Sequence, residues 1–343
     1  MERLKDMDLR GLTEYMANIG EKPFRAKQLF KWLQSGAGSF GDMTDLSKDL
    51  REKLGRDAVI WCLKKEKEQV SRDGTRKYLM ETEDGFFVET VFMKYRYGNS
   101  VCISSQAGCA MGCRFCASGV NGLERDLTPG EMTDQVLLAE GAAGGSAGHI
   151  VIMGTGEPLA NFDNVKTFIE NTHDPAGRGM SMRNITVSTC GIIPGIKRFT
   201  EELPQVNLAV SLHAPNDDVR NEIMPISMRY GIDELLCCCR AHAEKTGRRV
   251  TFEYALIKGL NDSDRHLSEL AGRLRGMLCH VNLIPLNDVI ESGLRGSGRE
   301  RAEEAKIFLE SRGIPCTVRR ELGADIDAAC GQLRLGKTGA AAH

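Results

Sequence analysis

The stretch Val101-Cys-Ile-Ser-Ser-Gln-Ala-Gly-Cys109-Ala-Met-Gly-Cys113-Arg-Phe-Cys116 joins an apolar strand candidate to a loop that carries three cysteines. At this spacing three thiolates can hold three corners of a [4Fe–4S] cluster, so that the fourth iron keeps an open position for a substrate. The alternative is a structural zinc site, which usually combines paired Cys-x2-Cys or Cys/His units. No second pair with that spacing follows here. The pattern therefore favours an iron–sulfur cluster bound by Cys109, Cys113 and Cys116.

This pattern, with an aromatic residue before the last cysteine, resembles the signature of the radical S-adenosylmethionine (SAM) enzymes. The resemblance implies that the open iron binds the amino and carboxylate groups of SAM. The expected cofactors are therefore a [4Fe–4S] cluster and SAM.

Composition indicates an ordinary globular protein: of 343 residues, 41% are hydrophobic and 27% are charged. The first eight residues are too charged for a signal peptide, and no apolar run is long enough to span a bilayer. Twelve cysteines in such a chain predict reduced thiols and a cytoplasmic location. The net charge of −2 does not indicate nucleic-acid binding, so any RNA contact must depend on local basic patches.

The chain divides into two predicted regions, a small accessory module over residues 1–95 and a barrel over residues 96–343. In the module we expect helices over residues 24–33 and 44–54, followed by strands over 72–80 and 86–93. The first helix should bury one apolar face, made of Phe24, Leu29, Phe30 and Leu33. Its basic residues, Lys22, Arg25, Lys27 and Lys31, are either phosphate contacts of an RNA-binding module or a solvated face.

From residue 100 onward, strand and helix patterns alternate, which predicts parallel βαβ units. The strand candidates are Val101–Ser105, His149–Gly154, Asn184–Ser188, Val206–Leu212, Val250–Ile257 and Val281–Pro285. Capping boxes at Thr128-Pro-Gly-Glu131 and at Ser297-x-x-Glu300 mark two helix starts. Six units cannot close an eight-stranded barrel, so we expect an α/β fold with an open, partial (β/α)6 barrel rather than a doubly wound sheet.

Polar or glycine-rich segments follow several of these strands, where a barrel places its active site. The segments are Met153-Gly-Thr-Gly-Glu-Pro-Leu159, Val187-Ser-Thr189, Ser211-Leu-His-Ala214 and Asn282-Leu-Ile-Pro-Leu-Asn287. Each one alone could be a structural turn. Together they predict a cofactor site at the carboxyl ends of the strands.

With the cysteine loop and Asp325-Ile-Asp-Ala-Ala-Cys-Gly-Gln-Leu333, these segments resemble the RlmN/Cfr family of radical SAM RNA adenine methyltransferases along nearly the whole chain. The resemblance implies a SAM site made of Gly156, Glu157, Ser188, Ser211, Leu212, His213 and Asn287. It also implies that Cys330 carries a methyl group, that Cys102 resolves the adduct, and that Glu89 accepts a proton. Taken alone, Cys102 would be a buried core cysteine, and Glu89 would be an exposed strand carboxylate.

The implied activity is methylation of adenine C2 in 23S rRNA and in tRNA, with two SAM molecules, a methyl-cysteine intermediate and a transient disulfide. A flavodoxin or ferredoxin would supply electrons, and the chain would act as a monomer without a membrane partner. Three alternatives stay open: methylation at C8 as in Cfr, a radical SAM enzyme that does not methylate, and a non-catalytic iron–sulfur RNA-binding factor. The other cysteines, Cys62, Cys190, Cys237, Cys238, Cys239, Cys279 and Cys316, are expected in packing roles.

Overall fold

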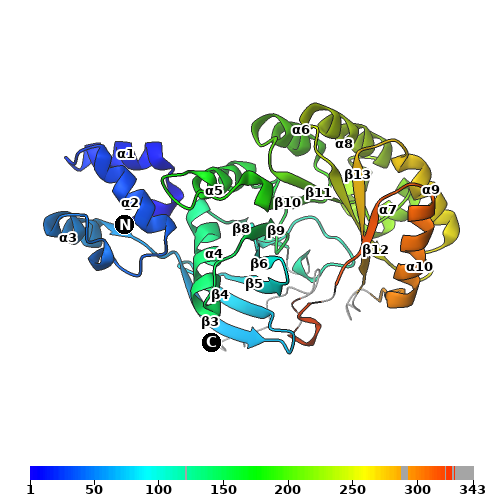
Figure 1. Cartoon of the computed structure of the whole chain (residues 1–343), viewed down its shortest axis with the longest axis horizontal. Coiled ribbons are helices and arrows are strands. Elements are labelled where there is room, and N and C mark those ends of the chain that lie inside the picture. Colours follow the sequence, from blue (N-terminus) through cyan, green and yellow to red (C-terminus); the bar gives the residue numbers. More distant parts are fainter. Residues whose placement is uncertain (120–121, 287–292, 321, 327, 329–343) are drawn as a thin grey trace.

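The structure is a computed structural model that describes residues 1–119, 122–286, 293–320, 322–326 and 328. A small helical module at the N-terminus and a larger α/β part lie side by side along the long axis of the molecule (Figure 1). Within the described ranges, no helix is long and apolar enough to cross a membrane.

The N-terminal module packs three helices around a hydrophobic cluster of its own. They are α1 (Leu9–Asn18), α2 (Phe24–Gln34) and α3 (Lys48–Asp57). On α2 the expected apolar face is buried except for Phe24, which is 54% exposed at the first position of the helix. The predicted start of α3 at residue 44 was wrong, because the Ser47 hydroxyl accepts the Leu50 N–H and caps the helix there.

A ten-stranded sheet forms the larger part, and its strand order is β14-β13-β12-β11-β10-β9-β6-β5-β4-β3. The strands of the antiparallel portion are β3 (Leu63–Val70), β4 (Arg76–Thr82), β5 (Phe87–Tyr95) and β6 (Gly98–Ile103). Those that continue in parallel from β6 are β9 (His149–Ile152), β10 (Ile185–Thr189), β11 (Asn207–Ser211), β12 (Val250–Leu256), β13 (Cys279–Pro285) and β14 (Cys316–Val318). The six predicted barrel strands are confirmed, and the sheet is open because β14 and β3 are its two edges.

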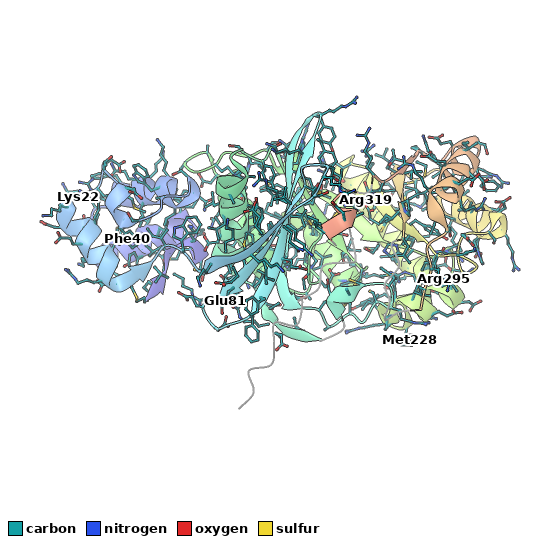
Figure 2. All side chains as sticks on the ribbon, turned by 90° about the horizontal axis from the view of Figure 1, so that it is seen from below. Lys22, Phe40, Glu81, Met228, Arg295 and Arg319 are labelled. Atoms are coloured by element: carbon teal, nitrogen blue, oxygen red, sulfur yellow. The ribbon has the colours of Figure 1, made fainter. Side chains whose placement is uncertain are left out.

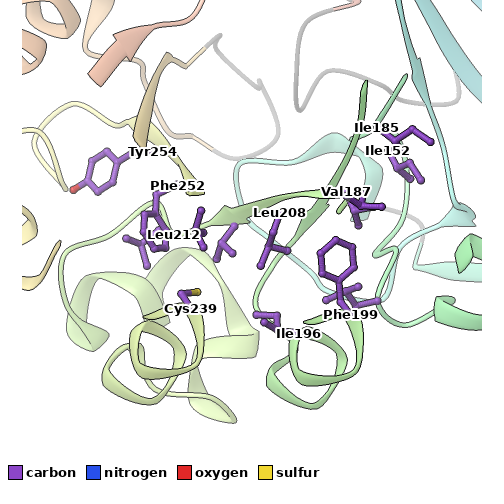
Figure 3. Close-up of a cluster of buried hydrophobic side chains, with 14 of the residues drawn as sticks. Ile152, Ile185, Val187, Ile196, Phe199, Leu208, Leu212, Cys239, Phe252 and Tyr254 are labelled. Atoms are coloured by element: carbon purple, nitrogen blue, oxygen red, sulfur yellow. The ribbon is translucent and has the colours of Figure 1, made fainter. Parts of the chain in front are cut away.

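Helices cover the outer face of the parallel strands (Figure 1). They are α4 (Pro129–Ala143), α5 (Phe162–His173), α6 (Ile193–Glu202), α7 (Asp217–Ile223), α8 (Ile232–Thr246), α9 (Asp264–Leu274) and α10 (Gly298–Ser311). The main core lies between sheet and helices, where Phe199, Leu208 and Leu212 pack together (Figure 3). This arrangement leaves the inner face of the sheet for the site.

The two predicted capping boxes behave differently. At α4, the Thr128 side chain accepts the Glu131 N–H, and the Glu131 carboxylate accepts the Thr128 N–H, as expected. At α10 the helix forms, but the cap prediction was wrong, because the Ser297 hydroxyl donates to the Asp262 carboxylate instead (2.8 Å). A tertiary partner therefore replaced a local one.

The module is tied to the sheet by a buried ion pair. The Lys5 ammonium lies 2.6 Å from the Asp134 carboxylate on α4, and both side chains are fully buried. The other Asp134 oxygen accepts the backbone N–H groups of Cys62 (2.6 Å) and Leu63 (3.1 Å) at the start of β3. The predicted domain boundary at residue 95 falls between β5 and β6, which are paired strands of one sheet.

A short segment after β14 crosses toward the opposite side of the sheet; we call residues 322–326 the C-terminal strap. The Gly323 N–H donates to the Asp73 carboxylate (2.9 Å) in the turn between β3 and β4. In the same turn, the Ser71 hydroxyl and the Arg72 N–H donate to the Asp325 carboxylate (2.5 and 3.2 Å). The strap thus connects β14, at one edge of the sheet, to the turn between β3 and β4 at the other edge.

Candidate cofactor pocket and active site

The cysteine loop lies between two short paired strands, β7 (Gln106–Gly108) and β8 (Leu123–Asp126), that follow β6. Cys109, Cys113 and Cys116 line one cavity, and we call it the cofactor pocket. Burial raises the pKa of the Cys109 thiol to about 11 and raises that of Cys113 further. A positively charged metal group would reverse this effect, because it binds and stabilises the thiolate form.

The donor set fits a cluster better than a single ion. Among the described residues, no three His, Cys, Asp or Glu side chains converge closely enough to hold one metal ion. The three cysteines nevertheless share one cavity, as expected if each thiolate binds a different iron.

A fully buried arginine, Arg220 on α7, lies behind the cysteine loop. Its guanidinium donates to the carbonyl oxygens of Cys190 (2.7 Å) and Leu212 (3.2 Å), and its Nη1 has no hydrogen-bond partner in the described part of the chain. Burial lowers the pKa of Arg220, and the neighbouring Cys190 and Cys113 thiols oppose this. No carboxylate of the described residues forms an ion pair with Arg220, which fits a site that receives a negatively charged group.

The glycine-rich loop after β9 forms one wall of the cofactor pocket. Gly156 has a φ of +110°, and a Cβ there would lie 2.6 Å from the Gln106 Cβ. Glycine is therefore required for the loop to pack against β7. The Glu157 carboxylate accepts the backbone N–H groups of Cys190 (2.7 Å) and Leu159 (3.0 Å), which fixes the loop.

Three further expected residues meet at the strand ends. Ser188, Ser211 and His213 all line the cofactor pocket. The hydroxyl groups of the two serines make no hydrogen bond within the described residues, so both can face a ligand. Leu212 differs, because its side chain lies in the main core (Figure 3) and only its backbone faces this region.

His213 is held in a strained conformation, with a φ of +54°. Its Nδ1 accepts the Ala255 N–H (2.9 Å), and its ring meets the edge of Phe115 at 4.6 Å between centroids. Burial lowers the pKa of His213 to about 3, and the charge of Arg220 adds to this. The ring is therefore neutral at pH 7, with its proton on Nε2.

Sequence reasoning missed several residues of the pocket, including Cys190, Glu253 and Arg319. It also missed Arg220, which bonds to the Cys190 carbonyl from behind the pocket. The expected packing role of Cys190 is confirmed, because Cys190 is buried in a hydrophobic cluster with Phe115 and Ile223, and it also lines the pocket beside Glu157. The packing role expected for Cys237 was wrong, because Cys237 is exposed, whereas Cys238 and Cys239 are buried as expected. The Glu253 carboxylate, buried on β12, accepts from Asn282 (2.9 Å) and lies 3.7 Å from the Arg319 guanidinium.

Glu89 and Cys102 lie on the same inner face of the sheet. Glu89 is 5% exposed and pairs with the Lys77 ammonium at 3.2 Å, so the expectation of an exposed carboxylate was wrong. Val91, two residues after Glu89 on β5, is the register partner of Cys102 on β6. Cys102 packs in a small cluster with Val91, Met93 and Ala328. Two predicted residues, Asn287 and Cys330, lie outside the described residues.

Known proteins share these features over nearly the whole chain. Residues 3–60 match the ribosomal RNA large subunit methyltransferase N-terminal domain, and residues 103–271 match the radical SAM superfamily. The chain is 49% identical over 336 residues to a probable dual-specificity RNA methyltransferase RlmN of Thermoanaerobacter sp. strain X514, covering 97% of this chain and 98% of that one.

Two further comparisons agree with this. A probable dual-specificity RNA methyltransferase RlmN of Caldanaerobacter subterraneus is 51% identical over 336 residues, covering 97% of this chain and 98% of that one. The crystal structure of a radical SAM methyltransferase from Sphaerobacter thermophilus superposes with a TM-score of 0.94 at 46% identity, covering 97% of this chain and 99% of that one.

Proposed function

The chain belongs to the RlmN family of radical SAM RNA methyltransferases, with a [4Fe–4S] cluster and SAM as cofactors, and from this premise we propose that it methylates C2 of adenine. The substrates are 23S rRNA and tRNA, in keeping with the dual specificity named for its relatives. Adenine C2 is electron-poor and has no lone pair, so a radical addition is required there.

In this proposal Cys109, Cys113 and Cys116 hold the cluster. SAM is lined by Gly156, Glu157, Ser188, Ser211, Leu212, His213 and Asn287. The cluster supplies the one-electron reductive cleavage of SAM, with electrons from a flavodoxin or ferredoxin. The hydroxyl groups of Ser188 and Ser211 bind SAM, while neutral His213 and the Glu157 carboxylate hold the surrounding loops in place.

Three residues carry the methyl transfer. Cys330 takes a methyl group from the first SAM, and the second SAM activates that group for addition to adenine C2. Glu89 accepts the C2 proton, which restores the aromatic ring. The Cys102 thiolate then attacks the Cys330 sulfur, so that a disulfide forms and the carbon–sulfur bond breaks. The released carbon keeps the bonding electron pair and takes up a proton to become the product methyl group, and the one electron left over from the radical addition would return to the cluster. A cellular thiol reduces this disulfide by exchange.

One observation carries the proposal: Glu89 and Cys102 lie on adjacent strands of the same inner face, beside the cofactor pocket. Met153 lines that pocket and also packs against the cluster that contains Cys102. A proton acceptor and a thiol are therefore close to where SAM would react. The ion pair with Lys77 fixes the Glu89 carboxylate in place.

The test uses anaerobically reconstituted enzyme with RNA. Cys330→Ala should lose methyl loading but keep iron and SAM cleavage, whereas Cys102→Ala should stall as a covalent protein–RNA adduct. Cys62→Ala, which removes a buried thiol far along the chain from the site, is the matched control and should turn over normally. Full turnover by Cys102→Ala would reject its role.

Nucleoside mass analysis distinguishes the remaining functions. We expect 2-methyladenosine in RNA from cells with the gene and none from cells without it. Detection of 8-methyladenosine alone would reject C2 in favour of C8, and SAM cleavage without any RNA methylation would indicate a non-methylating enzyme. We further propose that the enzyme is a cytoplasmic monomer, since its chemistry needs reduced thiols and one chain supplies every named residue.

A further inference from the structure

Lys77 on β4 lies in the same row of the sheet as Cys102. In the strand register, Lys77 is opposite Val91 on β5, and Val91 is opposite Cys102 on β6. Glu89 stands two positions before Val91, so its side chain points to the same face, about 6.6 Å along the strand. The Lys77 ammonium reaches this neighbour diagonally and lies 3.2 Å from the Glu89 carboxylate. A cation is therefore in direct contact with the residue proposed to accept the C2 proton.

Both side chains of this ion pair are almost completely shielded from water. The exposed fraction is 8% for the Lys77 side chain and 6% for that of Glu89. Burial disfavours the ionised form of a carboxyl group, whereas a cation at this distance favours it. Because only the ionised form can accept a proton as a general base, the charge of Lys77 acts on the property that Glu89 needs for its proposed role.

The C-terminal strap covers part of the same face with apolar side chains. Leu322 and Ile326 pack against the cluster that contains Cys102. Charge interactions are stronger in such an apolar environment than at the surface. The Ser71 hydroxyl donates to the carboxylate of Asp325 in the strap (2.5 Å) and lowers the pKa of that carboxyl. The strap therefore brings apolar side chains to the ion pair and turns its own charge to the turn between β3 and β4.

The other carboxylates on the elements around the pair have partners of their own. In the turn before β4, Asp73 accepts the N–H of Gly323 (2.9 Å). Glu81, on the same face of β4, is opposite Lys64 in the strand register. Figure 2 shows Glu81 toward the N-terminal module and away from Arg319, which lines the cofactor pocket. These two carboxylates therefore do not compete for the ammonium of the ion pair.

We propose that Lys77 is a positioning residue that keeps Glu89 ionised for the removal of the adenine C2 proton. In this step the proton moves to the Glu89 carboxylate, the electron pair of the C–H bond stays in the ring, and the electron left over from the radical addition returns to the cluster. Lys77 keeps its own proton and acts through its charge alone. This inference rests on the proposed role of Glu89 and goes beyond it, because it names the group that controls the pH at which Glu89 can act.

The experiment measures methylation of an RNA hairpin by reconstituted enzyme from about pH 6 to about pH 9. Lys77→Gln keeps a hydrogen-bond donor but removes the charge, so the rate should fall about 100-fold at pH 7. This deficit should shrink about tenfold between pH 7 and pH 8, because a buried carboxyl group without its cation ionises only at higher pH. Lys77→Arg keeps the charge and should stay within about threefold of wild type at every pH. Lys65→Gln breaks a more exposed pair with Glu68, also at 3.2 Å, and is the matched control.

Two further measurements separate the charge effect from a loss of structure. With deuterium at adenine C2, Lys77→Gln should show a larger isotope effect at pH 7 than wild type, because proton removal becomes the slow step. This effect distinguishes Glu89 from the Cys102 thiol, which acts after the proton has left. Infrared difference spectra at pH 7 without RNA should show a band of a protonated carboxyl group in Lys77→Gln, and Lys77→Gln/Glu89→Gln should lack this band.

A wild-type rate for Lys77→Gln at pH 7, or a deficit that is equal at every pH, would overturn the inference. Loss of methyl loading in Lys77→Gln would also overturn it, because the ion pair would then serve the folded structure alone. If Glu89→Gln methylates RNA at the wild-type rate, the proposed role of Glu89 fails and this inference fails with it. If Glu89→Gln is impaired while Lys77→Gln is not, the proposed function stands and only the inference is rejected.

Discussion

Replacing Asp134 with asparagine should detach the N-terminal module from the sheet. Asp134 and Lys5 are fully buried, so Asp134→Asn leaves an ammonium without its counter-charge in the protein interior. Breaking a buried pair from one side costs about 3–5 kcal/mol. The Lys5 ammonium also lies 3.6 Å from the Trp61 ring centroid, and that contact survives the change. We therefore expect the free energy of unfolding of the N-terminal module to decrease by about 3 kcal/mol, the lower limit of this range.

The chain offers a built-in reporter for this change. Its two tryptophans, Trp32 and Trp61, both lie in or beside the N-terminal module. Tryptophan fluorescence during urea denaturation therefore follows the module, while far-ultraviolet circular dichroism follows the whole chain. In Asp134→Asn the fluorescence transition should shift to lower urea and separate from the dichroism transition. The rate of RNA methylation should also decrease in Asp134→Asn, whereas the rate of SAM cleavage without RNA should stay unchanged.

Two variants control the interpretation. The double variant Lys5→Met/Asp134→Asn should recover most of the loss, because no buried charge remains and the amide oxygen can still accept from the Cys62 or Leu63 N–H. Lys48→Met breaks an exposed pair with Glu52 in the same module and should change the free energy of unfolding by less than about 1 kcal/mol. An Asp134→Asn variant within about 1 kcal/mol of wild type, or a double variant no better than the single, would refute the reasoning.

Three other changes probe the pocket itself. Gly156→Ala should lower the affinity for SAM at least about tenfold, measured by equilibrium dialysis, because the new Cβ would lie 2.6 Å from Gln106. Gly247→Ala is the control: Gly247 also has a positive φ but faces open space, so the affinity for SAM should stay unchanged. Arg220→Met should make the reduction potential of the reconstituted cluster more negative in redox titration, because a buried positive charge near the thiolates is lost; an unchanged potential would contradict this. Burial lowers the pKa of His213 from about 6.5 to about 3, so its contribution to the free energy of unfolding is complete above pH 6.5 and decreases as the pH falls. Between pH 7 and 5 the free energy of unfolding of wild type should therefore decrease by about 2 kcal/mol more than that of His213→Gln. Equal decreases in the two proteins would contradict this prediction.

Much of the fold could be predicted from local patterns. Alternating strand and helix signals located the six barrel strands, and the Thr128-to-Glu131 capping box located α4, because both signals depend on neighbours in sequence. The same logic failed at Ser297, whose hydroxyl has a stronger partner in Asp262, far away along the chain. A local signal is reliable only where no tertiary contact competes for the same atom.

The candidate site also contains some residues that could be predicted from the sequence and others that could not. Residues at the carboxyl ends of strands, such as Ser188 and Ser211, could be predicted because strand ends meet at one edge. Arg220 could not be predicted, because nothing in the sequence of the short helix Asp217–Ile223 indicates that its arginine is buried behind the cysteine loop. Alternation along β12 could place Glu253 on one face but not show that this face lines the interior. Burial depends on the arrangement of all the strands in the sheet, which no single strand encodes.

The C-terminal strap also has a consequence for how the chain folds. Its contacts join residues 254 and 250 positions apart, Ser71 with Asp325 and Asp73 with Gly323. Contacts this distant in sequence form late, after neighbouring strands have paired. The strap therefore joins a sheet whose two edges already exist. A partly folded chain can therefore gather the three cysteines of the loop after β7 before the strap is in place.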